Sequence, residues 1–131
     1  MKGFLEGDSV FLEPAQPDLA AEDIENMFSP PGFFTLRLDG AALKDKKSLL
    51  SELSSGLRFP AYFGGNWDAL LDCLRSLPDL IDAPGYALIV GNSPAMLSGS
   101  PEDLRTFREI ASEAGKFLAE HYGRPLRIVM L

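Results

Sequence analysis

Apolar and polar positions recur with two different periods along this chain. Predominantly apolar runs, typical of buried parallel strands, lie at Phe33–Leu38, Tyr86–Val90 and Leu126–Leu131, and only the second contains no charged residue or threonine. Between these runs, apolar residues recur every three or four positions and predict helices at 45–55, 66–77 and 100–122. Connections of this length suit parallel strands. The pattern therefore predicts an α/β domain, a small three-stranded parallel sheet with helices packed over it.

A different pattern precedes the first of these strands. The Ser-Pro-Pro-Gly sequence at 29–32 interrupts any helix or strand. Before it, two short apolar runs within residues 4–12 are compatible with a small hairpin, and a short acidic helix is predicted at 18–27. We therefore expect residues 1–32 to form an acidic N-terminal extension and residues 33–131 to form the main domain.

The most distinctive stretch runs from Phe59 to Leu77. Two glycines precede Asn66, whose side chain can cap a helix. At about 100° per residue, the inward stripe of this helix consists of Leu70, Cys73, Leu74 and Leu77. Asp68 and Asp72 lie on the opposite face, while Trp67 and Leu71 lie on its flank without an evident role in the core.

Composition narrows the class of protein. The chain has 131 residues, of which 46% are hydrophobic and 24% charged, as expected of one soluble domain. A single cysteine excludes an internal disulfide and indicates reducing conditions. No apolar run reaches the roughly 18 residues of a membrane span, and we recognise no signal peptide. We expect a cytoplasmic protein, without membrane contact and monomeric when free.

The net charge of −7 is unevenly distributed. Residues 1–32 contain seven acidic residues and one lysine, whereas residues 33–131 contain 12 acidic and 11 basic residues. An acidic chain argues against direct binding of nucleic acid, which requires clustered Lys and Arg. The charge favours a cationic protein partner, and we hypothesise that the acidic segment supplies part of the attracting field.

The paired aspartates allow several interpretations. The simplest interpretation is that both are solvent-exposed charges, and this explains Asp68 better than Asp72. The helix dipole favours Asp68 by up to about 1 kcal/mol, whereas Asp72 repels Asp68 at a cost of about 0.2–0.5 kcal/mol. A catalytic pair of carboxylates needs two different environments, whereas both aspartates project from the same exposed face. A metal site needs oxygen ligands in addition to the two carboxylates, and Arg75 follows on that face instead. We therefore expect no catalytic residue, metal or cofactor. A binding surface that includes Tyr62 fits better, since carboxylates accept paired hydrogen bonds from arginine.

The sequence Tyr62–Leu74, YFGGNWDALLDCL, resembles the Y-Y-G-x-N-x-D-A-L-W-D-C-L signature of the barstar family of ribonuclease inhibitors. The resemblance implies that this loop and helix occlude a nuclease active site. Asp72 would be the main mimic of substrate phosphate, Asp68 its neighbour, and Tyr62 an aromatic contact. The surrounding contact surface implied by the resemblance comprises Gly64, Asn66, Trp67 and Leu71.

The chain also departs from that signature. Leu71 stands where the family has tryptophan, a tryptophan occurs instead at Trp67, and Arg75 brings a positive charge to the predicted binding face. We expect these three positions to decide partner choice. A glutamate of the last helix also contributes in the family, and both Glu109 and Glu113 fit that place.

The sequence thus predicts an intracellular, stoichiometric protein inhibitor of a ribonuclease or toxin-like nuclease, with no enzymatic activity. Two alternatives from other classes stay open. One is a barstar-fold domain that binds a non-nuclease protein in a regulatory role. The other, more weakly supported, is a hydrolase that uses Asp68 and Asp72.

Overall fold

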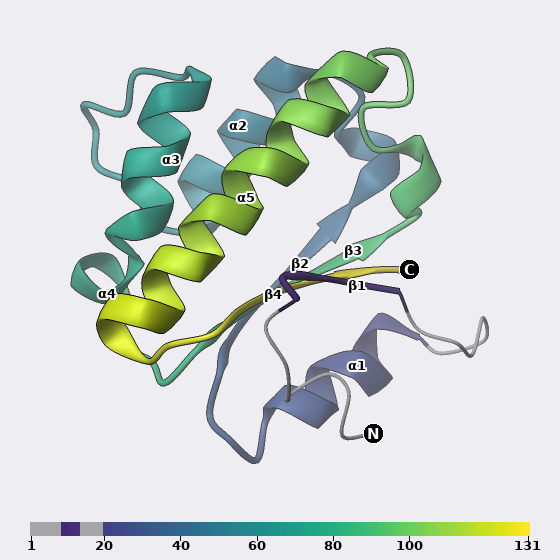
Figure 1. Cartoon of the computed structure of the whole chain (residues 1–131). Coiled ribbons are helices and arrows are strands. Elements are labelled where there is room, and N and C mark those ends of the chain that lie inside the picture. The colour runs from purple at the N-terminus through teal and green to yellow at the C-terminus, as the bar shows by residue number, and fades with distance from the viewer. Residues whose placement is uncertain (1–8, 14–19) are drawn as a thin grey trace.

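A computed structural model describes residues 9–13 and 20–131. Its described strands form one parallel sheet in the order β1-β4-β3-β2 (Figure 1). The strands are β1 (Phe11–Leu12), β2 (Phe34–Asp39), β3 (Tyr86–Gly91) and β4 (Leu126–Met130). The prediction of three strands is wrong, because β1 adds a fourth at the edge of β4. The sequence predicted the apolar run at this position as part of a hairpin, and its pairing with β4 joins segments far apart in the chain.

The helices of the main domain follow the predicted order. The α-helices of the described residues are α1 (Ala21–Phe28), α2 (Lys46–Gly56), α3 (Trp67–Arg75), α4 (Leu77–Leu80) and α5 (Pro101–Tyr122), with 3-10 turns at η2 (Gly40–Ala42) and η3 (Ser93–Ala95). Asp45 caps α2, since its Oδ1 accepts a hydrogen bond from the Ser48 amide at 2.8 Å. The helix predicted at 66–77 ends as α3 at Arg75, and Pro78 lies in the first turn of α4, where proline is well tolerated.

The direction of each crossover explains which face of the sheet each helix covers. From β2 through β3 to β4 the chain moves across the sheet one way, whereas from β1 to β2 it returns the other way. Right-handed connections then require α1 to lie on the face opposite α2, α3 and α5 (Figure 1). The side chains of β3 alternate accordingly: Tyr86, Leu88 and Val90 join the larger core, and Ala87 and Ile89 join a second one.

The second core is built on α1. Ile24 and Phe28 are fully buried against Ala87, Ile89 and Val129. On the same side, Glu25 of α1 pairs with Arg37 of β2 at 2.9 Å. The predicted acidic helix at 18–27 thus corresponds to α1, while the predicted hairpin lies partly outside the described residues. Its described strand, Phe11–Leu12, pairs with β4.

Val10, just before β1, packs against α5. Its side chain is buried and occupies the space beside Gly115, where an added Cβ would collide with Val10 Cγ2. The glycine therefore permits close approach of α5 to the edge of the sheet, at the usual cost of glycine within a helix.

We predict that Gly115→Ala destabilises the protein by about 1–3 kcal/mol, because the new methyl group overpacks this contact. In an exposed helix the same change stabilises by about 1 kcal/mol, so the sign of the effect is diagnostic. Urea unfolding measures it. In a Val10→Ala background the clash is absent, and Gly115→Ala should become stabilising. A stabilised Gly115→Ala single variant would contradict the packing described.

Candidate protein-binding site

The loop before α3 is anchored by two aromatic side chains and exposes a third. Phe59 is buried and Phe63 half-buried, with ring centroids 5.1 Å apart. Between them, Tyr62 is 87% exposed. Gly65 has a φ of +68° with nothing within 4 Å of a hypothetical Cβ, so backbone conformation is what favours glycine there. The packing of Phe59 and Phe63 therefore anchors the loop, and the Tyr62 ring between them in sequence is exposed to solvent.

Asn66 starts α3 as the sequence predicts. Its Oδ1 accepts a hydrogen bond from the Ala69 amide at 2.8 Å, which satisfies one of the unpaired donors of the first turn. The predicted inward stripe is confirmed, since Leu70, Cys73, Leu74 and Leu77 are all buried. The cap and this stripe together fix the rotation of the helix, and with it the direction of the outer face.

That outer face carries both aspartates. Asp68 and Asp72 are exposed. Among the described residues, neither carboxylate takes part in an ion pair or a side-chain hydrogen bond. The nearby charge of Asp72 adds to the effect of burial, which is the larger cause, in raising the pKa of the Cys73 thiol. Two negative charges thus stand on the surface without a neutralising partner in the described part of the chain.

Trp67 and Leu71 are more involved in packing than the sequence suggested. Both are half-buried and pack against the larger core, so they are not surplus to it. The Nζ atom of Lys46 lies 5.2 Å from the centre of the Trp67 ring, within range of a cation–π interaction. The flank of α3 therefore offers partly covered apolar surface, and a lysine from α2 adjoins it.

Arg75 is held by α5. Its Nη2 atom lies 3.1 Å from Glu113 Oε1, and its guanidinium carbon lies 5.1 Å from the centre of the Phe117 ring. The positive charge expected beside the aspartates is therefore paired with a glutamate of another helix. Of the two candidate glutamates, Glu113 is engaged in this pair, whereas Glu109 is exposed and forms no ion pair with the described residues.

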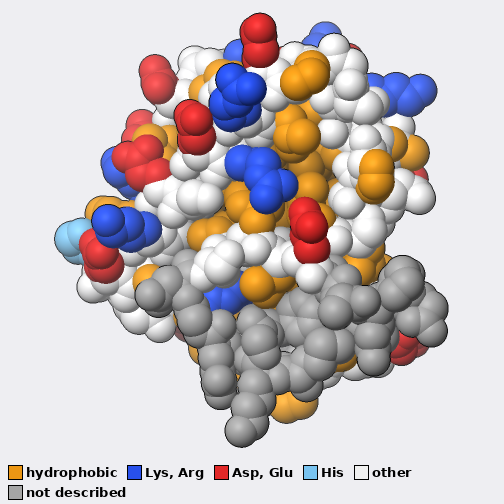
Figure 2. Space-filling model, turned by 45° about the vertical axis from the view of Figure 1, so that its right-hand side comes forward, with side chains coloured by type: hydrophobic (Ala, Val, Ile, Leu, Met, Phe, Trp, Pro, Cys, Tyr) orange, Lys and Arg blue, Asp and Glu red, His pale blue; other side chains and the backbone are white. Residues whose placement is uncertain are grey.

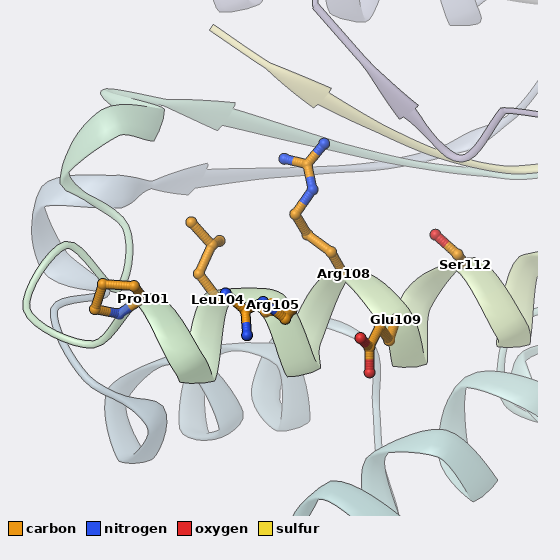
Figure 3. A pocket seen from close by; sticks show the side chains of 6 residues that line it. All are labelled: Pro101, Leu104, Arg105, Arg108, Glu109 and Ser112. Carbon is orange, nitrogen blue, oxygen red and sulfur yellow. The ribbon is translucent and has the colours of Figure 1, made fainter.

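Glu109 borders a hollow of about 490 Å³ along α5, whose lining residues are Pro101, Leu104, Arg105, Arg108, Glu109 and Ser112. Figure 3 shows Arg108 extending toward the strands and Glu109 leaving the helix on another side. The guanidinium of Arg108 lies 4.5 Å from the centre of the Phe11 ring. Figure 2 shows one face of the molecule on which apolar side chains gather beside Lys and Arg side chains.

A second hollow, of about 460 Å³, lies between α2 and the loop before α3. Its lining residues are Lys46, Lys47, Leu50, Ser51, Ser54, Ser55, Phe63 and Gly65. It adjoins the predicted binding surface directly, because Gly65 belongs to the loop and Lys46 covers Trp67. Sequence reasoning missed these lysines, since no local spacing connects α2 to α3.

A parallel sheet with an exposed, carboxylate-bearing helix defines a small α/β protein that presents an acidic surface. The profile of the family described as Barstar (barnase inhibitor) matches residues 33–130. The chain therefore belongs to the Barstar family, as the motif at Tyr62–Leu74 predicted. A search of curated proteins found no match. In the described part of the chain, no helix combines the length and apolar character needed to cross a membrane.

We predict that Cys73 reacts slowly with iodoacetamide in the folded protein, because burial and the charge of Asp72 raise its thiol pKa and so lower the thiolate fraction. Mass spectrometry should find labelling many times faster in denaturant, and Asp72→Asn should modestly speed labelling of the folded chain. Because the chain has one cysteine, the signal is unambiguous. Equal folded and denatured rates would contradict the burial of this side chain.

Proposed function

We propose that this protein is a stoichiometric inhibitor of a ribonuclease, which it binds through the loop and outer face of α3. Membership of the Barstar family supports the class. The observation that carries the proposal is the exposure of Asp68 and Asp72 on one face of a firmly anchored helix, with neither carboxylate in an ion pair among the described residues. The inhibitor occludes the active site, and it has no catalytic role.

The two carboxylates suit the active site of a ribonuclease electrostatically. Such a site binds phosphate with cationic groups, and arginine binds a carboxylate with the same paired hydrogen-bond geometry as a phosphate. Asp72 is the main mimic of the substrate phosphate and Asp68 assists it. Because the helix is capped by Asn66, the carboxylates are positioned before binding, which lowers the entropy cost of association.

The neighbouring side chains supply the remaining contact surface. Tyr62, 87% exposed, is an aromatic ring available for burial at the interface, where tyrosine often contributes strongly. Gly64, Asn66, Trp67 and Leu71 complete this surface around the carboxylates. Arg75 acts from its margin, where its pairing with Glu113 limits its repulsion of a cationic enzyme.

The cellular role follows from this chemistry. An inhibitor that leaves its partner's active site closed protects the cell that makes both proteins, so we propose an immunity function in the cytoplasm. The free inhibitor is monomeric. The competing class is a barstar-fold domain that regulates a non-nuclease protein, and inhibition assays separate the two.

We predict that Asp72→Ala weakens inhibition by at least about 100-fold, since it leaves buried cationic groups of the enzyme unpaired, at a cost of about 3 kcal/mol. RNA cleavage is titrated with the wild type and the variant, using barnase and any small basic nuclease encoded beside this gene. The wild type should inhibit one of them in a one-to-one ratio.

Asp79→Ala is the matched control, because Asp79 is exposed on α4 outside the proposed surface. It removes the same charge and should leave inhibition within about threefold of the wild type. Equal inhibition by wild type and Asp72→Ala would refute the central claim.

We also predict that the acidic N-terminal segment accelerates association through long-range attraction. Deleting residues 1–32 is unsuitable, since it would uncover the core beneath α1. The double substitution Glu13→Gln and Glu22→Gln instead removes two exposed charges. Stopped-flow association at low salt should slow by about twofold and converge with the wild type at about 1 M salt, where screening is nearly complete. An unchanged rate at low salt would eliminate the steering role.

A further inference from the structure

The hollow between α2 and the loop before α3 has the opposite charge to the aspartate face. Its charged lining residues are Lys46 and Lys47. Among the described residues, the ion pairs join Arg37 to Glu25, Arg75 to Glu113 and Arg124 to Asp82. Neither lysine takes part in one. The hollow is therefore a cationic site without a carboxylate paired to its amino groups in the described chain.

The acidic residues at α2 form no ion pair with these lysines among the described residues. Asp45 caps the helix, where hydrogen bonds from Ser48 are the main cause of its lowered carboxyl pKa and the charge of Lys47 is a smaller one. At about 100° per residue, Glu52 lies roughly 120° around the helix from Lys46 and roughly 140° from Lys47. The hydroxyl-bearing residues Ser51, Ser54 and Ser55 line the same hollow, so it combines two cations with hydrogen-bond donors.

The hollow is continuous with the proposed inhibitory surface. Gly65, in its wall, directly precedes the Asn66 cap, and Lys46 lies over Trp67, the residue before Asp68. A partner seated on Asp68 and Tyr62 therefore also meets the mouth of this hollow. An ordinary cationic enzyme surface would be repelled there, and an acidic one attracted.

We infer that the hollow formed by α2 and the loop before α3 receives a carboxylate-bearing segment of the same partner whose cationic active site binds Asp68 and Asp72. The inference rests on the proposed function and adds to it the kind of partner: a ribonuclease with an acidic segment beside its active site. Two adjacent contacts of opposite sign also fix the orientation of the complex, because reversing the partner would place like charges together.

The test exploits the sign of the charge effect. If the partner were uniformly cationic, replacing any surface lysine with glutamate would accelerate association. Here Lys47→Glu should instead slow association by at least about threefold at low salt, whereas Lys116→Glu on α5, which lines neither hollow, should leave it equal or faster. Lys47 is chosen because Lys46 is the lysine that makes the cation–π contact with Trp67. The probe is the nuclease that the wild type inhibits in the titration above.

Zero-length carbodiimide cross-linking of that complex gives an independent readout, since the reagent joins a lysine amine only to a carboxylate in direct contact. Mass spectrometry should find Lys46 or Lys47 joined to an Asp or Glu of the nuclease, and Lys116 unlinked. Substituting that acidic residue with lysine should restore fast association to Lys47→Glu.

The two proposals fail in different ways. If Asp72→Ala loses inhibition while Lys47→Glu binds as fast as the wild type and yields no cross-link in the wild-type complex, the inferred acidic contact is overturned and the inhibitory surface stands. If Asp72→Ala inhibits fully, the proposed function itself is overturned.

Discussion

Burial of a parallel sheet on both faces is the constraint on which the rest of this structure depends. The central strands β3 and β4 are buried along almost their whole length, which parallel strands require because their crossover helices cover them. Right-handed connections assign α2, α3 and α5 to one face. The opposite face would then expose Ala87, Ile89 and Val129, and α1 covers it. Both β1 and α1 thus belong to the packing of the sheet, although the family profile begins only at residue 33.

Rigid placement of α3 follows from that packing and makes its outer face useful. The nine-residue helix buries one stripe against the core, receives a cap from Asn66, and is joined to α5 by the pair between Arg75 and Glu113. Carboxylates on such an element need little ordering when a partner arrives, and functional groups on helices are positioned more precisely than groups on loops. The helical period therefore produces both the buried apolar stripe and the acidic outer face of α3. Packing of the stripe makes the helix rigid, and this rigidity positions the carboxylates of the outer face.

The sequence predicted those features whose causes are local. Helix periodicity located the inward stripe of α3, and the position of Asn66 before the helix predicted its cap. The apolar run that contains β1 was predicted as part of a hairpin, and its pairing with β4 was missed because it joins segments more than a hundred residues apart. The pairing of Arg75 was missed for a similar reason: Glu113 lies 38 positions away, and no spacing rule connects them. Lys46 over Trp67 is likewise a contact between α2 and α3 that only the tertiary structure reveals.

These non-local contacts change the meaning of the near-neutral charge of residues 33–131. A neutral body with mixed charges would steer a cationic enzyme poorly, but two patches here differ in sign: Asp68 and Asp72 lie on the outer face of α3, and Lys46 and Lys47 line the hollow beside α2. Screening in physiological salt acts over about 8 Å, so a partner in contact responds to each patch separately rather than to their sum. Opposite patches side by side give less long-range attraction than a uniformly acidic face and more discrimination of orientation. The distribution of charge therefore favours selection of one partner over capture of any basic protein.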